Sequence, residues 1–114
     1  MKTIGGDQLR GHLESLVLAV LEDGPAHGWD ICRRLDATSG GALALKEGSV
    51  YPALYRLERR GLVTAQWDDE PAQRRGPRRR VYRLSPKGRR ALVTARDQWQ
   101  HFAAIVTTIL GAPA

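Results

Sequence analysis

Arginine is concentrated in one short segment of this 114-residue chain. Residues 74–83 contain six arginines and no acidic residue, and they account for the whole formal net charge of +6. Guanidinium groups make charge-assisted hydrogen bonds to phosphate, and a polyanion relieves the repulsion within such a run. A solvated loop is the alternative interpretation. The predicted contacts with double-stranded DNA in this segment are Arg74, Arg75, Arg78, Arg79 and Arg80.

Residues 49–60 form a second group with nucleic-acid chemistry. At 100° per residue, Val50, Leu54 and Leu57 cluster on one helical face with Ala53 beside them. Side chains on the other face could bond phosphates and guanine edges, as helices in the major groove do. An ordinary amphipathic helix with a solvated polar face is the alternative. The predicted DNA contacts of this helix are Ser49, Tyr51, Pro52, Tyr55, Arg56 and Arg59.

Apolar residues in the last part of the chain follow a heptad pattern. Their spacing alternates between three and four residues, which is typical of the a and d positions of a helix that pairs with another helix. A chain this small has little core of its own to cover such a row, so the pattern predicts a homodimer. Packing against the first helix of the same chain is the alternative, and both arrangements can coexist. The predicted interface residues are Leu92, Ala95, Trp99, Phe102, Val106, Ile109 and Leu110.

Trp99 has two interpretations within this row. It packs as an ordinary aromatic residue between two helices, or it lines a pocket with Phe102 in which a small hydrophobic or aromatic effector stacks. We expect Trp67 to be structural, and we expect Cys32 to be a small buried hydrophobe and not a redox sensor. The acidic residues 68–70 are expected in a solvated turn near the basic segment.

The sequence offers no pattern for catalysis or for a metal. It has a single cysteine and three scattered histidines, and it lacks a glycine-rich phosphate loop and a nucleophile elbow. We therefore predict a protein that is not an enzyme and that needs no cofactor or metal. The longest apolar run, residues 16–21, is too short to span a bilayer, and no secretory signal precedes it. The expected location is the cytoplasm, in association with the nucleoid.

Local signals place these groups on defined elements. Pro52 is tolerated in the first turn of a helix, so Ser49 is the expected N-cap of the helix that contains it. Ser85 and Pro86 are expected to open the last helix. Alternating polarity predicts two strands around a basic hairpin loop. The expected elements are helices over about 8–22, 27–38 and 49–60, strands over 62–67 and 80–84, and a helix over 86–110.

This order predicts a mainly α (α+β) fold: a winged helix-turn-helix DNA-binding domain with a long C-terminal dimerisation helix. The third helix would enter the major groove, and the hairpin loop would be the wing. Residues 1–84 are assigned to the DNA-binding domain and residues 85–114 to the dimerisation helix, as one continuous folding unit.

Several motifs resemble those of the PadR family of transcriptional regulators, over residues 9–110. They are LRGHLE at 9–14, GPAHGWDI at 24–31, EGSVYPALYRLE at 47–58, GLV at 61–63 and YRLSPKG at 82–88. The short C-terminal part is similar to the subgroup with a single dimerisation helix. The sequence departs from the family pattern at Trp29, where tyrosine is common, and at Ser85, where threonine is common. The first departure removes a tyrosine hydroxyl from a possible phosphate contact, and the second keeps the N-cap chemistry.

The resemblance implies a homodimeric repressor that binds operator DNA, often near its own gene or a transporter gene. It implies that Ser49, Tyr51, Pro52 and Arg56 belong to the recognition helix and residues 74–80 to the wing. Some members release DNA when a hydrophobic or phenolic compound binds, and Trp99 falls near an aromatic residue of that pocket. With the residue patterns, this predicts a repressor on a palindromic operator. A protein–protein interaction module and an effector-binding protein without sequence-specific DNA binding are the alternatives.

Overall fold

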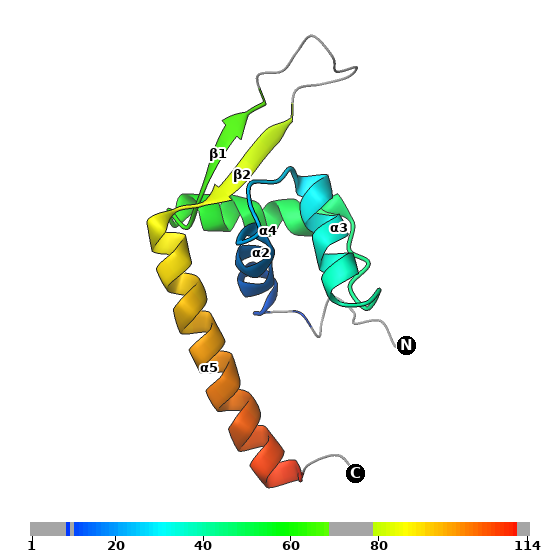
Figure 1. Ribbon diagram of the computed structural model, residues 1–114, viewed down its shortest axis with the longest axis vertical. Helices are drawn as coiled ribbons and strands as arrows, with labels where there is room; N and C mark the ends of the chain where they lie inside the picture. Colours follow the sequence, from blue (N-terminus) through cyan, green and yellow to red (C-terminus); the bar gives the residue numbers. More distant parts are fainter. Residues whose placement is uncertain (1–8, 10, 69–78, 112–114) are drawn as a thin grey trace.

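The computed structural model describes residue 9 and residues 11–68 and 79–111. Three helices form the body, a two-stranded hairpin projects from one side, and the last helix leads away on the other (Figure 1). This is the mainly helical architecture with a small sheet that the sequence predicts. The elements are α2 (Leu13–Leu21), α3 (Gly28–Thr38), α4 (Glu47–Arg59), β1 (Val63–Trp67), β2 (Arg80–Leu84) and α5 (Pro86–Leu110).

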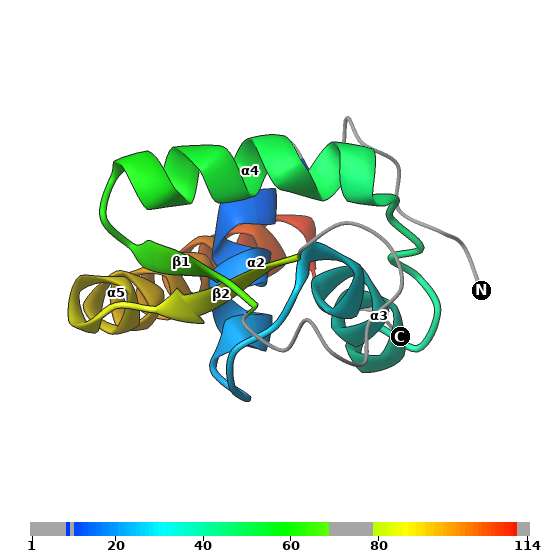
Figure 2. The ribbon, with the colours of Figure 1, turned by 90° about the horizontal axis from the view of Figure 1, so that it is seen from above.

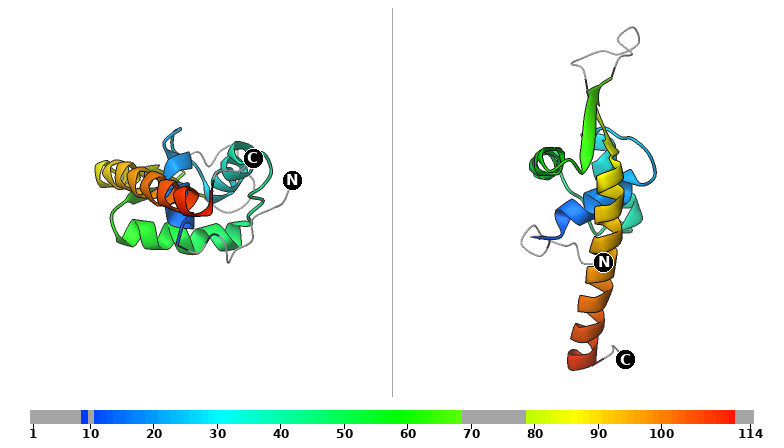
Figure 3. Two further views of the ribbon diagram at one scale, coloured as in Figure 1. Left: turned by 90° about the horizontal axis from the view of Figure 1, so that it is seen from below. Right: turned by 90° about the vertical axis from the view of Figure 1, so that its left-hand side faces the viewer.

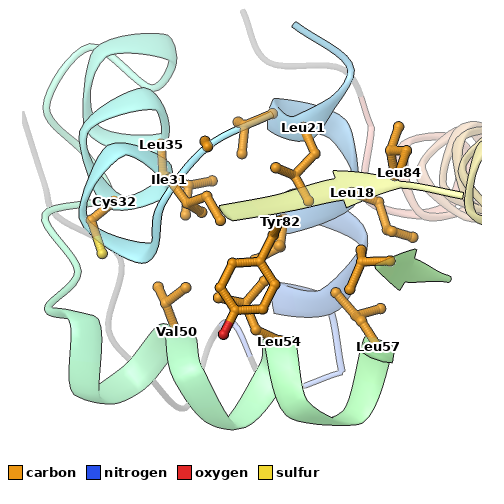
Figure 4. Packing of buried hydrophobic residues seen from close by; sticks show 14 of the residues in the cluster. Leu18, Leu21, Ile31, Cys32, Leu35, Val50, Leu54, Leu57, Tyr82 and Leu84 are labelled. Atoms are coloured by element: carbon orange, nitrogen blue, oxygen red, sulfur yellow. The ribbon is translucent and has the colours of Figure 1, made fainter. Parts of the chain in front are cut away.

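The core lies where α2, α3 and α4 meet the base of the hairpin. Seen from above, α4 passes across one end of α2, and α3 lies beside α2 near the other end of α4 (Figure 2). The predicted apolar faces are the buried ones, and Leu54, Leu57 and Ile31 have no exposed side-chain surface. Side chains from all three helices and from β2 point into the same space (Figure 4). Burial of such side chains supplies most of the favourable free energy of folding.

The predicted first helix, 8–22, is interrupted. Gly11 has a φ of +84°, which is a left-handed backbone conformation that a helix cannot continue through. α2 therefore begins only at Leu13, with His12 as its N-cap. Leu9 still packs into the core from the other side of the break.

The predicted start of the third helix is wrong. α4 begins at Glu47 with Lys46 as its N-cap, so that Ser49 is inside the helix and Pro52 is its sixth residue. Proline removes the hydrogen bond that its own N–H would donate to the carbonyl four residues earlier. That carbonyl belongs to Gly48, which is exposed and open to solvent. The loss of one solvated bond near the helix N-terminus is therefore tolerated.

The hairpin is attached to the helices through its backbone. β1 and β2 pair antiparallel, from Val63 with Leu84 to Trp67 with Arg80. The predicted strand bounds are confirmed, except that β1 begins one residue later. Ala26, just before α3, bonds Tyr82 in both directions, with N–H to carbonyl distances of 3.0 and 2.9 Å. The sheet thus gains a short third neighbour, which joins it to the turn before α3.

α5 begins as predicted. The hydroxyl of Ser85 accepts a hydrogen bond from the N–H of Gly88 at 2.9 Å, which is the N-cap arrangement, and donates one to the carbonyl of Gly61 at 2.6 Å. Gly88 packs so closely on Leu62 that a Cβ would lie 1.9 Å from the Leu62 carbonyl oxygen. α5 also packs on the body through Leu92, which belongs to the core, and its C-terminal part extends away from the body (Figure 3). Among the described residues, no helix is long and apolar enough to cross a membrane.

Candidate nucleic-acid interface

α4 presents a solvent-exposed face opposite its buried one. Tyr55 is 61% exposed at the middle of this face, and Pro52 and Arg59 are exposed on either side of it along the helix. The guanidinium Cζ of Arg59 lies 5.7 Å from the centre of the Tyr55 ring, within the range of a cation–π contact. Three of the predicted DNA contacts therefore share one outward face of α4.

Arg56 and Ser49 lie on the flank of α4 that faces α2. The Glu14 carboxylate of α2 accepts hydrogen bonds from Arg56 Nε at 3.4 Å and from Arg60 at 3.3 Å. Ser49 and Arg56 line a shallow open cleft with apolar residues that include Leu13. Sequence reasoning missed Glu14, which is far from Arg56 in the chain. The position of Glu14 on an amphipathic helix gave no signal of this pairing.

Tyr51 occupies the opposite flank, towards α3. A Cβ built on Gly28 would lie 2.8 Å from the Tyr51 hydroxyl oxygen, so the ring rests directly on the first residue of α3. Burial raises the pKa of Tyr51, and a hydrogen bond from its hydroxyl to the Glu47 carboxylate raises this pKa further. The Tyr51 ring therefore lies between α3 and α4, with its hydroxyl bonded to Glu47 in the first turn of α4.

Two further arginine–aromatic pairs lie beyond α4. Arg33 stacks on Trp29 in α3, with its Cζ 4.8 Å from the ring centre. Arg80 of β2 lies 5.6 Å from the ring of Trp67, the residue opposite it in β1. Trp29 and Trp67 are both half-exposed. Sequence reasoning missed Arg33, because only the buried side of that helix carried a periodic signal.

The predicted wing is described only at its base. Arg79 is exposed, whereas Arg80 is directed back onto the chain and pairs with Glu58 of α4. Asp68 approaches His27 at 3.3 Å, and the other ring nitrogen of His27 lies 3.1 Å from Asp30. The remaining predicted wing contacts, Arg74, Arg75 and Arg78, lie outside the described residues, as do residues 69 and 70.

The apolar row of α5 divides into a buried and an exposed part. Leu92 is 2% exposed and belongs to the core of its own chain, as the alternative of packing on the first helix expects. The row beyond it is open: Ile109 and Leu110 are 77% and 79% exposed. The remaining members are Ala95 and Val106, both half-buried, and Trp99 and Phe102, both exposed.

Trp99 belongs to a small aromatic group. Its ring centre lies 5.9 Å from that of Phe102, one turn further along α5. It also lies 5.5 Å from the ring of His12, in an edge-on arrangement, at the start of α2. The described residues contain no group of three histidine, cysteine, aspartate or glutamate side chains that could hold a metal ion.

Cys32 lies on the buried side of α3, as the sequence predicts. Burial raises the pKa of its thiol, and the nearby Glu47 carboxylate raises it further. A raised pKa leaves little of the reactive thiolate at neutral pH.

Comparison with known proteins decides the family. The sequence model of the family described as "Transcriptional regulator PadR-like family" matches residues 17–94, which is more than half of the chain. The chain belongs to the PadR-like family of transcriptional regulators. This confirms the resemblance inferred from the motifs. PadR-like regulators bind DNA and are not enzymes, so the predicted class of protein is confirmed as well.

Solved structures of PadR-like and other regulators share the fold. A PadR-like transcription factor from Bacteroides fragilis is 31% identical, with a TM-score of 0.74 over 90% of this chain and 95% of that one. A transcriptional regulator from Clostridium thermocellum is 24% identical, with a TM-score of 0.80 over 93% and 97% of the two chains. An uncharacterised transposon protein of Streptomyces fradiae is 40% identical over 69% of this chain, which spans only 20% of that protein. The winged-helix fold predicted for this PadR-like chain is confirmed by these neighbours.

Proposed function

We propose that this PadR-like protein is a transcriptional repressor that binds a palindromic operator as a homodimer. α4 would enter the major groove, and the arginine-rich wing would contact phosphates or the adjacent minor groove. One observation carries the proposal: α3 and α4 each present an exposed aromatic ring with an arginine stacked on it. Stacked guanidinium groups are held ready for bidentate contacts to phosphate or guanine.

The outward face of α4 is the part best suited to read bases. Pro52, Tyr55 and Arg59 are exposed on it, and Tyr51 lies at its edge with its hydroxyl fixed beside α3. Ser49 and Arg56 are expected to contribute less to recognition, because they lie towards α2. Arg79 and the three predicted wing arginines before it would supply affinity through phosphates, which carries little sequence information.

The exposed row of α5 supports association of two copies. Burial of one large apolar side chain contributes roughly 1.5–3 kcal/mol, and the end of α5 leaves several uncovered. A second copy of the chain has the same exposed row on its α5, so a symmetric pair of helices buries both rows. The two α4 helices would then face half-sites roughly 34–36 Å apart. Such a regulator would act at the nucleoid, in the cytoplasm.

The aromatic group around Trp99 favours a second, compatible function, which is release by an effector. Trp99 and Phe102 are exposed beside His12, and a planar aromatic compound could stack on them between two protomers. Titration with a panel of planar aromatic compounds should quench the Trp99 emission, and this change should vanish in Trp99→Phe. Emission that stays constant across the panel would assign Trp99 to packing alone.

Selection of bound duplexes from a random DNA pool tests the main proposal. An enriched palindrome with half-sites one helical turn apart is the expected result. Light scattering of the free protein should give the mass of two chains. The absence of any salt-sensitive DNA binding would overturn the proposal and favour a protein–protein interaction module. Repression is tested separately, by a reporter gene placed behind the selected sequence.

A further inference from the structure

The side chain of Arg80 contacts α4, which sets it apart from the exposed Arg79 beside it. It is the first residue of β2, and its Nη2 donates a hydrogen bond to Glu58 Oε2 of α4 at 3.0 Å. The side chains of the pair are only 37% and 32% exposed. The contact joins the hairpin directly to the helix expected to read DNA.

Two aromatic rings hold the same guanidinium group. Its Cζ lies 5.6 Å from the ring of Trp67 and 5.8 Å from that of Tyr82. Trp67 is the cross-strand partner of Arg80, and Tyr82 is two residues further along the same strand, so all three share one face of the hairpin. The Nε of Arg80 is buried and has no hydrogen-bond partner among the described atoms. A group with this environment is not free to follow a phosphate.

The position of the pair on the hairpin gives the contact its effect. Trp67 and Arg80 form the last pair of the sheet before residues 69–78, which carry three of the other four predicted wing contacts. The backbone bonds between Ala26 and Tyr82 fix the hairpin two residues lower. The contact of His27 with Asp68 joins the hairpin to the same turn before α3, whereas the Arg80–Glu58 pair joins it to α4.

We propose that Arg80 is a positioning residue, which acts through Glu58 to set the direction of the wing relative to α4. The wing and the recognition helix would then engage one continuous stretch of duplex. The inference rests on the proposed DNA-binding function and deepens it. It assigns a specificity role to Glu58, an acidic residue that would otherwise only repel DNA.

The competing account makes Arg80 a direct phosphate contact, and the two accounts predict different salt dependence. Loss of one phosphate contact reduces the slope of log affinity against log salt by about 0.9 and weakens all duplexes alike. Loss of positioning lowers the affinity for the selected duplex more than the affinity for a scrambled duplex of the same length. We expect Arg80→Gln to lower the ratio of these two affinities about tenfold, as coupled sites do. An unchanged ratio with a slope reduced by about 0.9 would overturn the inference.

A charge exchange provides the sharper test. Arg80→Glu and Glu58→Arg should each impair discrimination, and the double variant, which has the net charge of the wild type, should recover most of it. Arg79→Glu combined with Glu58→Arg is the matched control, and this variant should not recover discrimination. Failure of the exchanged pair to recover, with a melting temperature near that of the wild type, would contradict a positioning role. If the exchanged pair does not fold, Arg80→Lys should retain more discrimination than Arg80→Gln, and equal loss would contradict the role.

These outcomes are distinct from failure of the proposed function. A wild-type protein without salt-sensitive DNA binding would refute that function itself. If the wild type binds DNA but the exchanged pair does not recover discrimination between duplexes, only the positioning role is refuted.

Discussion

The carboxylate of Glu14 in α2 accepts a hydrogen bond from the Nε of Arg56 in α4 at 3.4 Å. This pair turns Arg56 towards the body, whereas Arg59, three residues further along, stacks on the exposed ring of Tyr55. The two arginines of one helix therefore have different surroundings, although they look alike in the sequence.

Arg59→Ala should weaken binding to the selected duplex more than Arg56→Ala does. An arginine that pairs with a base typically contributes about 1–3 kcal/mol of discrimination, and Arg59 is the one on the outward face. Fluorescence anisotropy with selected and scrambled duplexes measures both effects. Glu14→Gln serves as a control, since it releases Arg56 without removing it. Equal discrimination in the two alanine variants would contradict this division.

Gly28→Ala should reduce DNA affinity through Tyr51. The new methyl group would lie 2.8 Å from the Tyr51 ring and hydroxyl, so that the ring must move from its place beside α3. The same anisotropy titration measures the loss. Combination with Tyr51→Ala makes the test specific: Gly28→Ala should have little additional effect in that background. Additive losses would indicate that Gly28 acts independently of Tyr51.

Gly88→Ala should destabilise the fold strongly, because a Cβ there would overlap the carbonyl oxygen of Leu62. Overpacking of a well-packed site typically costs about 1–3 kcal/mol. Gly48→Ala is the matched control, since it is also helical and a Cβ there meets no atom within 4 Å. It should stabilise α4 by about 0.5–1 kcal/mol. Urea unfolding monitored by circular dichroism measures the free energy of unfolding of both variants. Similar values for Gly88→Ala and Gly48→Ala would refute the packing argument.

Ile109→Asp should convert the proposed dimer to a monomer. Ile109 is largely exposed on the apolar row of α5, and a carboxylate there would be buried at great cost in a paired helix. Val93→Asp is the control, because Val93 is also exposed but lies on the opposite side of the helix. Light scattering at micromolar concentration distinguishes the two masses. A dimer that persists in Ile109→Asp would exclude this row as the interface.

The ion pair between Arg96 and Glu22 should make the stability of the fold decrease as the pH is lowered into the acid range. The hydrogen bond from Arg96 lowers the pKa of Glu22 in the folded chain. A depressed carboxyl pKa adds stability above the unfolded pKa, and this is lost as pH falls through the folded pKa. Arg96→Met should therefore melt below the wild type at neutral pH, with the gap closing in acid. Arg90→Met controls for the lost charge, and a gap independent of pH would contradict the role of Glu22.

The elements with local signals were predictable from the sequence. Ser85 and Pro86 mark the start of α5, and the alternating residues 80–84 mark β2, because capping and pleat alternation depend on neighbours in the chain. The start of α4 was not, since proline at the sixth helical position is tolerated only because the carbonyl that it leaves unpaired is exposed.

The partners of the interface arginines were also beyond sequence reasoning. Glu14 and Glu58 come close to Arg56 and Arg80 only through the packing of α2 and the hairpin against α4. An arginine-rich segment predicts a basic surface, but it does not say which guanidinium is already occupied. That distinction depends on tertiary contacts. The partners are separated by 22 residues in the Arg80–Glu58 pair and by 42 residues in the Arg56–Glu14 pair.

α5 is held to the body as far as Trp99, whose ring lies beside His12, and the length beyond it is free of the core. In the proposed dimer, the separation of the two reading helices would be set by how the free lengths pair, and the bases read would be set by α4. Substitutions far along α5 could therefore alter the operator spacing while leaving each half-site unchanged. The two properties of the operator would then be open to separate evolutionary change.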